Sequence, residues 1–431
     1  LYGSSKNLAI AEILDADAPS VIVCPNSDSV RSVLRDIRFF SDNKLDVELL
    51  TDLEMLPYDL NPPIRGLKAS RSETFYKLAC GQTKLLILNA QNLLWRIPEP
   101  SFFTGNAKEL KTSDQIKIDD IQDIFSINGY ERVNVVTFPG EYSIRGSIID
   151  FYSTINRFAV RIDLMGDTID SMRQFDIETQ LTIEPIESCR IIPVDLFSKT
   201  RKEIEFFKMS FRNSNEGNHM EWPLYQSIDD DYEANGVYNY LPYFHKKTVS
   251  LLDYFDDETK FICIGDIAES LDAYEELIIS RHSDFQMDQQ PMISPDDLFF
   301  KSSTQIERIV NGNYSTIHEK KVLEKDLSEK NHDSLPISFL LQNIEQSELA
   351  NIFEFKAKNN LSKLLLSIPN LLKRNALIEQ LKNEDMNYSV VNDWSEFINN
   401  QSELCICKED IDQGFILKNH CLAVLTEKDI Y

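Results

Sequence analysis

The sequence predicts an α/β protein, with an α/β layer near each end of the chain and a smaller α+β module between them. Three observations lead to this fold class. In the first hundred residues short apolar runs alternate with helical patterns, and the last hundred residues repeat that rhythm. Between Arg157 and Met165, in the middle part of the chain, apolar side chains instead recur at every second position. Apolar runs between helices are typical of buried parallel strands, whereas a period of two is typical of strands with one buried face.

Length and composition indicate a globular protein of several domains. The chain of 431 residues is longer than one ordinary core, and its size favours about three domains. Its 42% hydrophobic and 10% aromatic residues are enough to fill a normal interior. The formal net charge of −26, from 70 acidic and 44 basic residues, repels nucleic acid at long range. We therefore expect weak DNA binding at best from this chain alone.

The chain shows no sign of a membrane or secretory protein. No apolar run is long enough to cross a bilayer, and no charged-then-apolar leader opens the sequence. The seven cysteines are odd in number and lack the spacing of a disulfide framework, which favours a reducing cytoplasmic location. Cys405 and Cys407 lie in an apolar stretch, so we interpret them as buried strand residues and expect no metal site.

The first hundred residues predict a parallel α/β layer. Buried strands are predicted at Ser20–Pro25 and Lys84–Asn89, and a further short strand at Asp46–Leu50. Helices are predicted at Asn7–Leu14, from Ser27 through Phe40, and near Ser70–Ala79. Strand, helix and strand at this spacing imply neighbouring parallel strands.

An α/β layer can bind nucleotides, and two segments of the chain are candidates for nucleotide motifs. Before the first helix, Gly3–Asn7 has one glycine and a lysine, but Asn7 stands where a phosphate loop has a hydroxyl residue. We interpret this segment as a helix entrance. Later, Asp266 follows an apolar strand as a single carboxylate, so we expect it to cap the helix Ile267–Ile279 rather than to hold a metal. The sequence therefore predicts no cofactor and no catalytic residues.

The middle module is built around the segment from Glu141 to Phe151 and the strand predicted at Arg157–Met165. In that strand Phe158, Val160, Ile162 and Leu164 form the buried face. The other face carries Arg157, Ala159, Arg161, Asp163 and Met165, which we expect to point into solvent or at a partner. A turn at Gly166 then leads into a third strand, Thr168–Asp176, so that the module presents a three-stranded face.

From residue 126 to residue 193 the basic residues are all arginines, which is unusual for this chain. Residues 126–193 contain six arginines and no lysine, although the whole chain has 27 lysines and 17 arginines. Arginine is suited to planar, two-pronged binding of a carboxylate or phosphate, and lysine does not replace it there. The bias points to recognition of an anionic group.

These patterns divide the chain into four segments. Residues 1–106 form the first part of a nucleotide-binding-like α/β domain, and residues 107–193 form the inserted α+β module. Residues 194–330 are expected to return and pack on the first domain, and residues 331–431 to form a small separate α/β domain. A polar, charged stretch from Glu307 to Ser334 precedes the last domain.

A series of short motifs runs in order along the chain. They are Leu56-Pro57-Tyr58-Asp59, Ser70-Arg71, Gly129-Tyr130, Gly140-Glu141-Tyr142-Ser143-Ile144-Arg145-Gly146, Ile149-Asp150-Phe151, Arg161-Ile162-Asp163, Phe175-Asp176, Gln180-Leu181-Thr182 and Leu251-Leu252-Asp253-Tyr254-Phe255. Together they resemble the N-terminal region of the bacterial transcription-repair coupling factor (Mfd) family, which is itself similar to the excision-repair protein UvrB. The resemblance covers nearly the whole chain and is most specific from Gly140 to Gln180.

The resemblance implies a fold, a function and partners. The fold is a UvrB-like, degenerate RecA-type α/β domain with an inserted α+β module, followed by a separate small α/β domain. The function is that of a non-catalytic adaptor in nucleotide excision repair, which recruits the damage-recognition ATPase UvrA to lesion-stalled RNA polymerase. Translocation, polymerase binding and DNA binding belong to later domains of such proteins, outside this sequence. UvrA and those other domains are the implied partners.

The resemblance also implies site residues. The family's partner-binding arginines correspond to Arg145 and Arg161, and an aromatic residue of some members is replaced by Met165, which keeps an apolar contact without the ring. With the neighbours on the predicted strand, the candidate UvrA-binding residues are Arg145, Arg161, Met165, Arg157 and Asp163.

Two enzymatic alternatives stay open at this point. The 70 acidic residues could supply the acid and base of an intracellular carboxylate-based hydrolase, although no two of them are spaced convincingly. An NTP-dependent enzyme would require nucleotide binding by this chain. A single surface arginine, finally, is most often part of a weak solvated ion pair.

Overall fold

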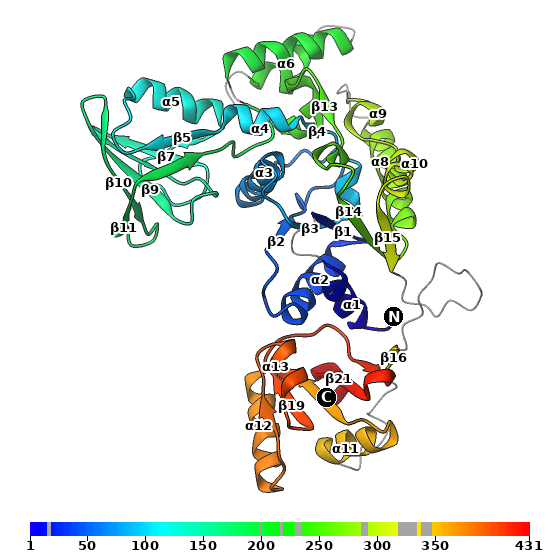
Figure 1. The fold of residues 1–431 in the computed structure, drawn as a ribbon. Coiled ribbons are helices and arrows are strands. Elements are labelled where there is room, and N and C mark those ends of the chain that lie inside the picture. The colour runs from blue at the N-terminus through cyan, green and yellow to red at the C-terminus, as the bar shows by residue number, and fades with distance from the viewer. Residues whose placement is uncertain are drawn as a thin grey trace.

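The computed structural model describes residues 1–14, 19–198, 200–215, 219–228, 235–285, 292–317, 334–337 and 347–431. Within these residues the chain is an elongated α/β structure with three large sheets (Figure 1). One sheet lies in the middle of the molecule, the second extends to one side, and the third lies at the end near the C-terminus. The predicted fold class is confirmed, because parallel and mixed sheets alternate with helices.

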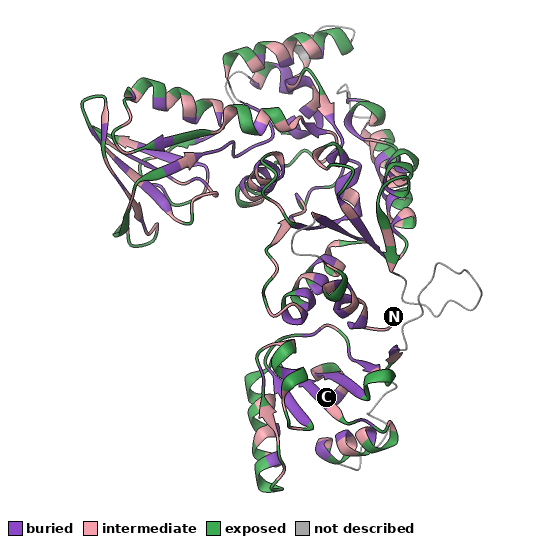
Figure 2. Ribbon diagram, in the orientation of Figure 1, coloured by how far each residue is buried: buried purple, intermediate pink, exposed green. Residues whose placement is uncertain are grey.

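The central sheet is wholly parallel, with the strand order β15-β14-β1-β3-β2. Its strands are β1 (Ser20–Cys24), β2 (Val47–Leu50), β3 (Leu85–Asn89), β14 (Lys260–Ile264) and β15 (Tyr314–Ile317). The helices of this part are α1 (Ser5–Ile13), α2 (Ser27–Phe40), α3 (Arg65–Ala79), α4 (Pro100–Asn106), α6 (Arg201–Ser214), α7 (Pro223–Ser227), α8 (Ile267–Phe285), α9 (Pro295–Leu298) and α10 (Ser302–Val310). β1, β3 and most of β14 are buried (Figure 2). Such strands form parallel sheets covered by helices on both faces, as the apolar runs predict.

The two candidate segments for nucleotide motifs have structural roles. Gly3 has φ +54°, and a Cβ there would lie 2.5 Å from the carbonyl oxygen of Gly414. Ser4 N donates to the Gln413 carbonyl (3.2 Å), and α1 begins at Ser5, so the predicted helix entrance is confirmed. Asp266 Oδ1 accepts from the backbone N–H groups of residues 268 and 269 (3.1 and 3.2 Å), as predicted for a cap of α8.

The module contains a six-stranded sheet with the order β11-β10-β9-β8-β7-β6. The strands are β6 (Glu131–Arg132), β7 (Glu141–Arg145), β8 (Ile148–Phe151), β9 (Ala159–Met165), β10 (Thr168–Phe175) and β11 (Thr182–Ile186). The predicted three-stranded face is therefore wrong. Gly146, at φ +66°, folds the segment Glu141–Phe151 into the hairpin of β7 and β8, and short strands extend both edges.

The helix α5 (Ile118–Ile127) covers one face of the module sheet. Phe125 of α5 stacks on Tyr142 with ring centroids 4.5 Å apart, and it also contacts Phe151. A two-stranded ladder of β5 (Lys108–Lys111) and β12 (Ser188–Ile191) carries the chain into and out of the module. A second short ladder, β4 (Ile97–Pro98) with β13 (Thr248–Val249), lies in the central part.

The C-terminal sheet has the order β16-β20-β21-β17-β19-β18, with β16 and β20 antiparallel to their neighbours. Its elements are β16 (Ser334–Pro336), α11 (Glu348–Lys358), β17 (Lys363–Ser367), α12 (Leu371–Asn383), β18 (Ser389–Val390), α13 (Trp394–Asn399), β19 (Leu404–Cys407), β20 (Phe415–Leu417), β21 (Leu422–Thr426) and α14 (Glu427–Ile430). All four residues of β19 are buried, which confirms the interpretation of Cys405 and Cys407 as strand residues.

The C-terminal sheet packs against the first two helices. Leu8 of α1 and Phe39 and Phe40 of α2 share one apolar cluster with residues of β17, β19 and β21. The Trp394 ring lies edge-on to that of Phe40, with centroids 5.1 Å apart. Thus a segment expected to be separate shares a core with the central part. The four segment limits themselves stay a prediction.

Several further expectations concern the chain as a whole. All seven cysteines are free thiols. In the part of the chain that the structure describes, no helix is both long and apolar enough to span a membrane. Most of the polar stretch from Glu307 to Ser334 lies outside the described residues.

Candidate functional site

The module sheet has one face covered by α5 and an opposite face rich in charge. Directly paired residues on neighbouring strands share a face, and the register places Asp150 beside Arg161 and Arg161 beside Arg173. In the next row Asp163 pairs with Ser171 and with Ile148. We call the following set the polar face: Arg145, Asp150, Arg161, Asp163, Met165, Ser171 and Arg173.

Asp150 is the centre of an ion-pair network on this face. Its Oδ1 accepts from Arg161 Nε (2.6 Å), and its Oδ2 accepts from Arg161 Nη2 (2.9 Å) and from Arg145 Nη2 (2.5 Å). The carboxylate is 1% exposed, so it depends on these donors in place of water. Arg161 binds it in the two-pronged geometry that is typical of strong arginine–carboxylate pairs.

The two arginines differ in exposure and in the donors that they keep available for another molecule. The Arg161 side chain is 15% exposed, and its guanidinium also lies 4.6 Å from the centroid of the Phe175 ring. Hydrogen bonds to Asp150 raise the pKa of Arg161, which keeps its positive charge secure. Arg145 is 51% exposed and binds Asp150 through Nη2. Because a guanidinium has five N–H donors, Arg145 is the better placed of the two to bind another molecule.

A second ion pair continues the network. Asp163 pairs with Arg173, and Ser171 Oγ donates to the same carboxylate (3.4 Å). Arg173 lies directly opposite Arg161, where two like charges would repel each other, but each binds its own carboxylate. Three arginines and two carboxylates leave the polar face with one net positive charge, in a chain of formal charge −26.

Two expectations for this face are wrong. The strand begins at Ala159, and Arg157 precedes it in a bend, with its guanidinium 5.2 Å from the ring centroid of Phe158. Arg157 is exposed but does not share the face of Arg161 through the period of the strand. Ala159 is 1% exposed, not in solvent, because Val136 and Phe175 pack on it.

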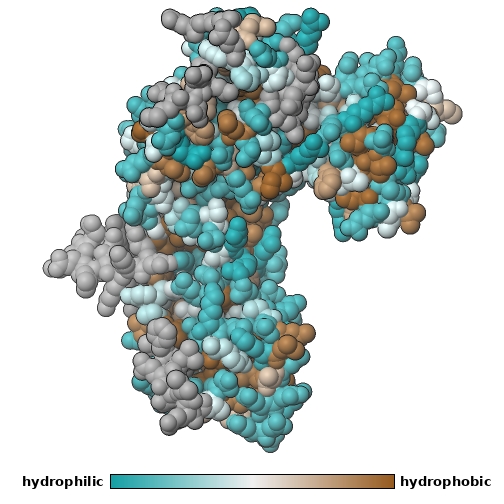
Figure 3. All heavy atoms as spheres, turned by 180° about the vertical axis from the view of Figure 1, so that it is seen from behind, coloured by the Kyte–Doolittle hydropathy of each residue, from teal (hydrophilic) through white to brown (hydrophobic). Residues whose placement is uncertain are grey.

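Met165 ends β9 beside the turn at Gly166, and it is 71% exposed. Other exposed apolar side chains of the module are Val135, Phe138, Leu181 and Ile183. Apolar patches lie among polar atoms on the module as seen from behind (Figure 3). An exposed thioether at the edge of a charged face can add apolar contact to a docking surface.

The sequence pointed to Arg145, Arg161, Asp163 and Met165, and the structure brings these residues onto one face. It adds Asp150 and Arg173, which were not proposed as site residues. A signal was present for both, since Arg173 is one of the six arginines and Asp150 is the single polar residue within Ile148–Phe151. The pairing of strands, which decides their neighbours, was not readable.

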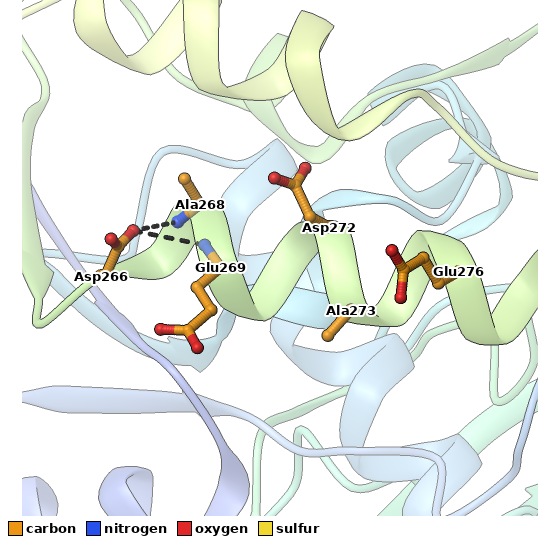
Figure 4. A pocket seen from close by; sticks show the side chains of 6 residues that line it. All are labelled: Asp266, Ala268, Glu269, Asp272, Ala273 and Glu276. Carbon is orange, nitrogen blue, oxygen red and sulfur yellow. Dashed lines mark hydrogen bonds between the residues drawn. The ribbon is translucent and has the colours of Figure 1, made fainter.

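A separate group of carboxylates lies on α8 (Figure 4). Asp266, Glu269, Asp272 and Glu276 line an open surface depression, and all four residues are exposed. Asp266 caps the helix, and Asp272 accepts a hydrogen bond from the Ser302 hydroxyl. A carboxylate-based hydrolase needs a paired acid and base around a substrate. These carboxylates on one solvent-facing helix surface do not supply that arrangement, and the hydrolase is not supported.

Comparisons with known proteins agree with the resemblance found in the sequence. The family model of the UvrB interaction domain matches residues 109–197, and that of the MFD D3 domain matches residues 357–430. The chain is 26% identical over 432 residues to the transcription-repair-coupling factor of Haemophilus influenzae, which covers 98% of this chain and 37% of that protein. It is 27% identical over 314 residues to the factor of Escherichia coli, covering 72% of the chain and 27% of the relative. The relative from Bacillus subtilis is 25% identical over 285 residues, with 61% and 23% covered.

The matched proteins are much longer than this chain. It spans between about a quarter and somewhat more than a third of the length of these relatives. The resemblance to the UvrB-like region of transcription-repair coupling factors is thus confirmed.

Proposed function

From the resemblance of this chain to the N-terminal region of transcription-repair coupling factors, we propose that it is a non-catalytic adaptor that recruits UvrA in nucleotide excision repair. The proposal assigns UvrA binding to the module, because the family model that matches there is the UvrB interaction domain. Contact with a stalled RNA polymerase and movement on DNA are assigned to further domains of a longer protein.

The polar face is the surface we assign to this role. The observation that supports it most directly is Arg145, a half-exposed guanidinium held at Nη2 by a buried carboxylate. Such a group can bind an acceptor on a partner while keeping its own geometry. Met165 and the neighbouring pair of Asp163 and Arg173 would form the rim of the contact.

We assign Arg157 a smaller role in partner binding. It is exposed but lies outside the ion-pair network, so we assign it at most to the edge of the contact. Rim charges mainly affect the rate of association and its salt dependence.

A titration of the purified chain with UvrA tests the proposal. We expect Arg145→Ala to weaken binding by about 1–3 kcal/mol, or about five-fold to 150-fold, as for a charged interface anchor. Arg308→Ala is a matched control, because Arg308 is 38% exposed and binds Asp253 through one Nη2 contact (2.7 Å) away from the module. No binding by the wild-type chain would end the proposal. Equal affinity of wild type and Arg145→Ala would remove the site assignment.

A further inference from the structure

Asp150 is a buried carboxylate that is paired with two arginines. It lies on β8, between two arginines that come from the neighbouring strands β7 and β9. Both of its oxygens are occupied by guanidinium donors, at 2.5 to 2.9 Å. Ser143, its direct neighbour on β7, donates its hydroxyl to the Asn134 carbonyl instead (3.0 Å). The two arginines are therefore the main groups that stabilise this buried charge.

The hydrogen bond to Asp150 constrains the side chain of Arg145. Arg145 is the last residue of β7, next to the turn at Gly146, and its side chain is half-exposed. An arginine in such a position would otherwise sample many rotamers, and a partner would have to immobilise it on binding. The bond from Nη2 to Asp150 fixes one end of the guanidinium, and the half-exposed side chain has further donors for a partner.

We infer that Asp150 is a positioning residue for partner binding, which acts by holding Arg145 in a binding-ready geometry. The inference rests on the proposed function and deepens it. Arg161 serves the same arrangement, because its two bonds keep the Asp150 carboxylate in one orientation. Asp150 itself is 1% exposed and is too buried to touch a partner.

If this carboxylate is lost, control of binding by charge and control by geometry predict opposite changes in affinity. Asp150→Asn keeps the size of the side chain but raises the net charge of the polar face from one positive charge to two. If long-range attraction controlled binding to an acidic partner, the variant would bind more tightly. If positioning controls it, the variant binds more weakly, because Arg145 has lost its charged anchor.

The test is a titration of UvrA with the whole chain and four variants. We expect Asp150→Asn to lose about ten-fold in affinity, the cost of immobilising one long side chain. The double variant Asp150→Asn/Arg145→Ala should bind no more weakly than Arg145→Ala alone, because the effect passes through Arg145. Asp195→Asn is the control for loss of a buried carboxylate, since Asp195 is 4% exposed and binds Lys68 and Tyr238 instead. It should retain the wild-type affinity.

A second measurement needs no partner. In the free chain, ¹⁵N relaxation of the arginine Nε–H groups should show Arg145 becoming more mobile in Asp150→Asn but not in Asp195→Asn. Unchanged or tighter UvrA binding by Asp150→Asn, with wild type binding normally, overturns the inference, as does unchanged Arg145 mobility. Absence of binding by wild type overturns the proposed function instead, and the relaxation data then decide the positioning of Arg145 by themselves.

Discussion

Replacement of Arg161 by alanine separates the roles of the two arginines that bind Asp150. The change removes both donors of the two-pronged pair and the contact of the guanidinium with Phe175. The Asp150 carboxylate, 1% exposed, would keep only the hydrogen bond from Arg145. A buried charge that loses its main partner is the situation in which ion pairs matter most for stability.

The expected loss can be worked from these contacts. Removal of one partner of a buried pair costs about 3–5 kcal/mol, and the remaining bond from Arg145 reduces this toward the lower end. We therefore expect Arg161→Ala to destabilise the module by about 3 kcal/mol. Arg145→Ala should cost less than about 1 kcal/mol, because Arg145 is half-exposed and Arg161 still occupies both oxygens of Asp150.

Native-state hydrogen exchange on the amides of β8 and β9 is the suitable assay. It reports the opening of the module without requiring the whole chain to unfold in one step. A loss below about 1 kcal/mol for Arg161→Ala, or equal losses for Arg161→Ala and Arg145→Ala, would refute the assignment of Arg161 as the main support of the buried carboxylate.

Two further predictions concern other residues. Met165→Asp should leave the thermal unfolding of the chain unchanged, because the side chain is 71% exposed, and should weaken UvrA binding by about 1 kcal/mol; a titration in which affinity does not fall would exclude Met165 from the contact. Burial raises the pKa of Asp36 to about 6, so the folded chain holds this proton more tightly than the unfolded chain. The free energy of unfolding should therefore rise by about 1 kcal/mol as the pH falls from 7.5 to 5.5. Asp36→Asn should abolish that gain, and an unfolding experiment with the same pH dependence in both chains would contradict it.

Local patterns in the sequence were enough to predict most elements. The apolar runs located β1 and β3 to within a residue, because fully buried strands consist of little else. The less buried β2 was also located to within a residue. The cap of α8 was predicted from Asp266, whose Oδ1 accepts from the N–H groups of residues 268 and 269, at 3.1 and 3.2 Å. Caps depend on adjacent residues, so they can be read from the chain alone.

Features that depend on how strands and helices pair or pack were not predictable in this way. The sequence indicated an arginine-rich face, but strand pairing brings Asp150 between Arg145 and Arg161. The interface of the C-terminal sheet was also missed. It involves Phe39 and Phe40, two adjacent aromatic residues at the end of α2, which a local pattern assigns only to some core. Trp394, whose ring contacts both, lies more than 350 residues away.

The most direct test of the account is a hydrogen-exchange footprint of the chain with and without UvrA. If the polar face binds UvrA, amides of β7 to β10 should exchange more slowly in the complex, with the strongest protection around Arg145 and Met165. The acidic surface of α8 and the C-terminal strands should be unchanged. Protection confined to α8 or to the C-terminal sheet, with the module unaffected, would contradict the assignment of the polar face as the docking surface.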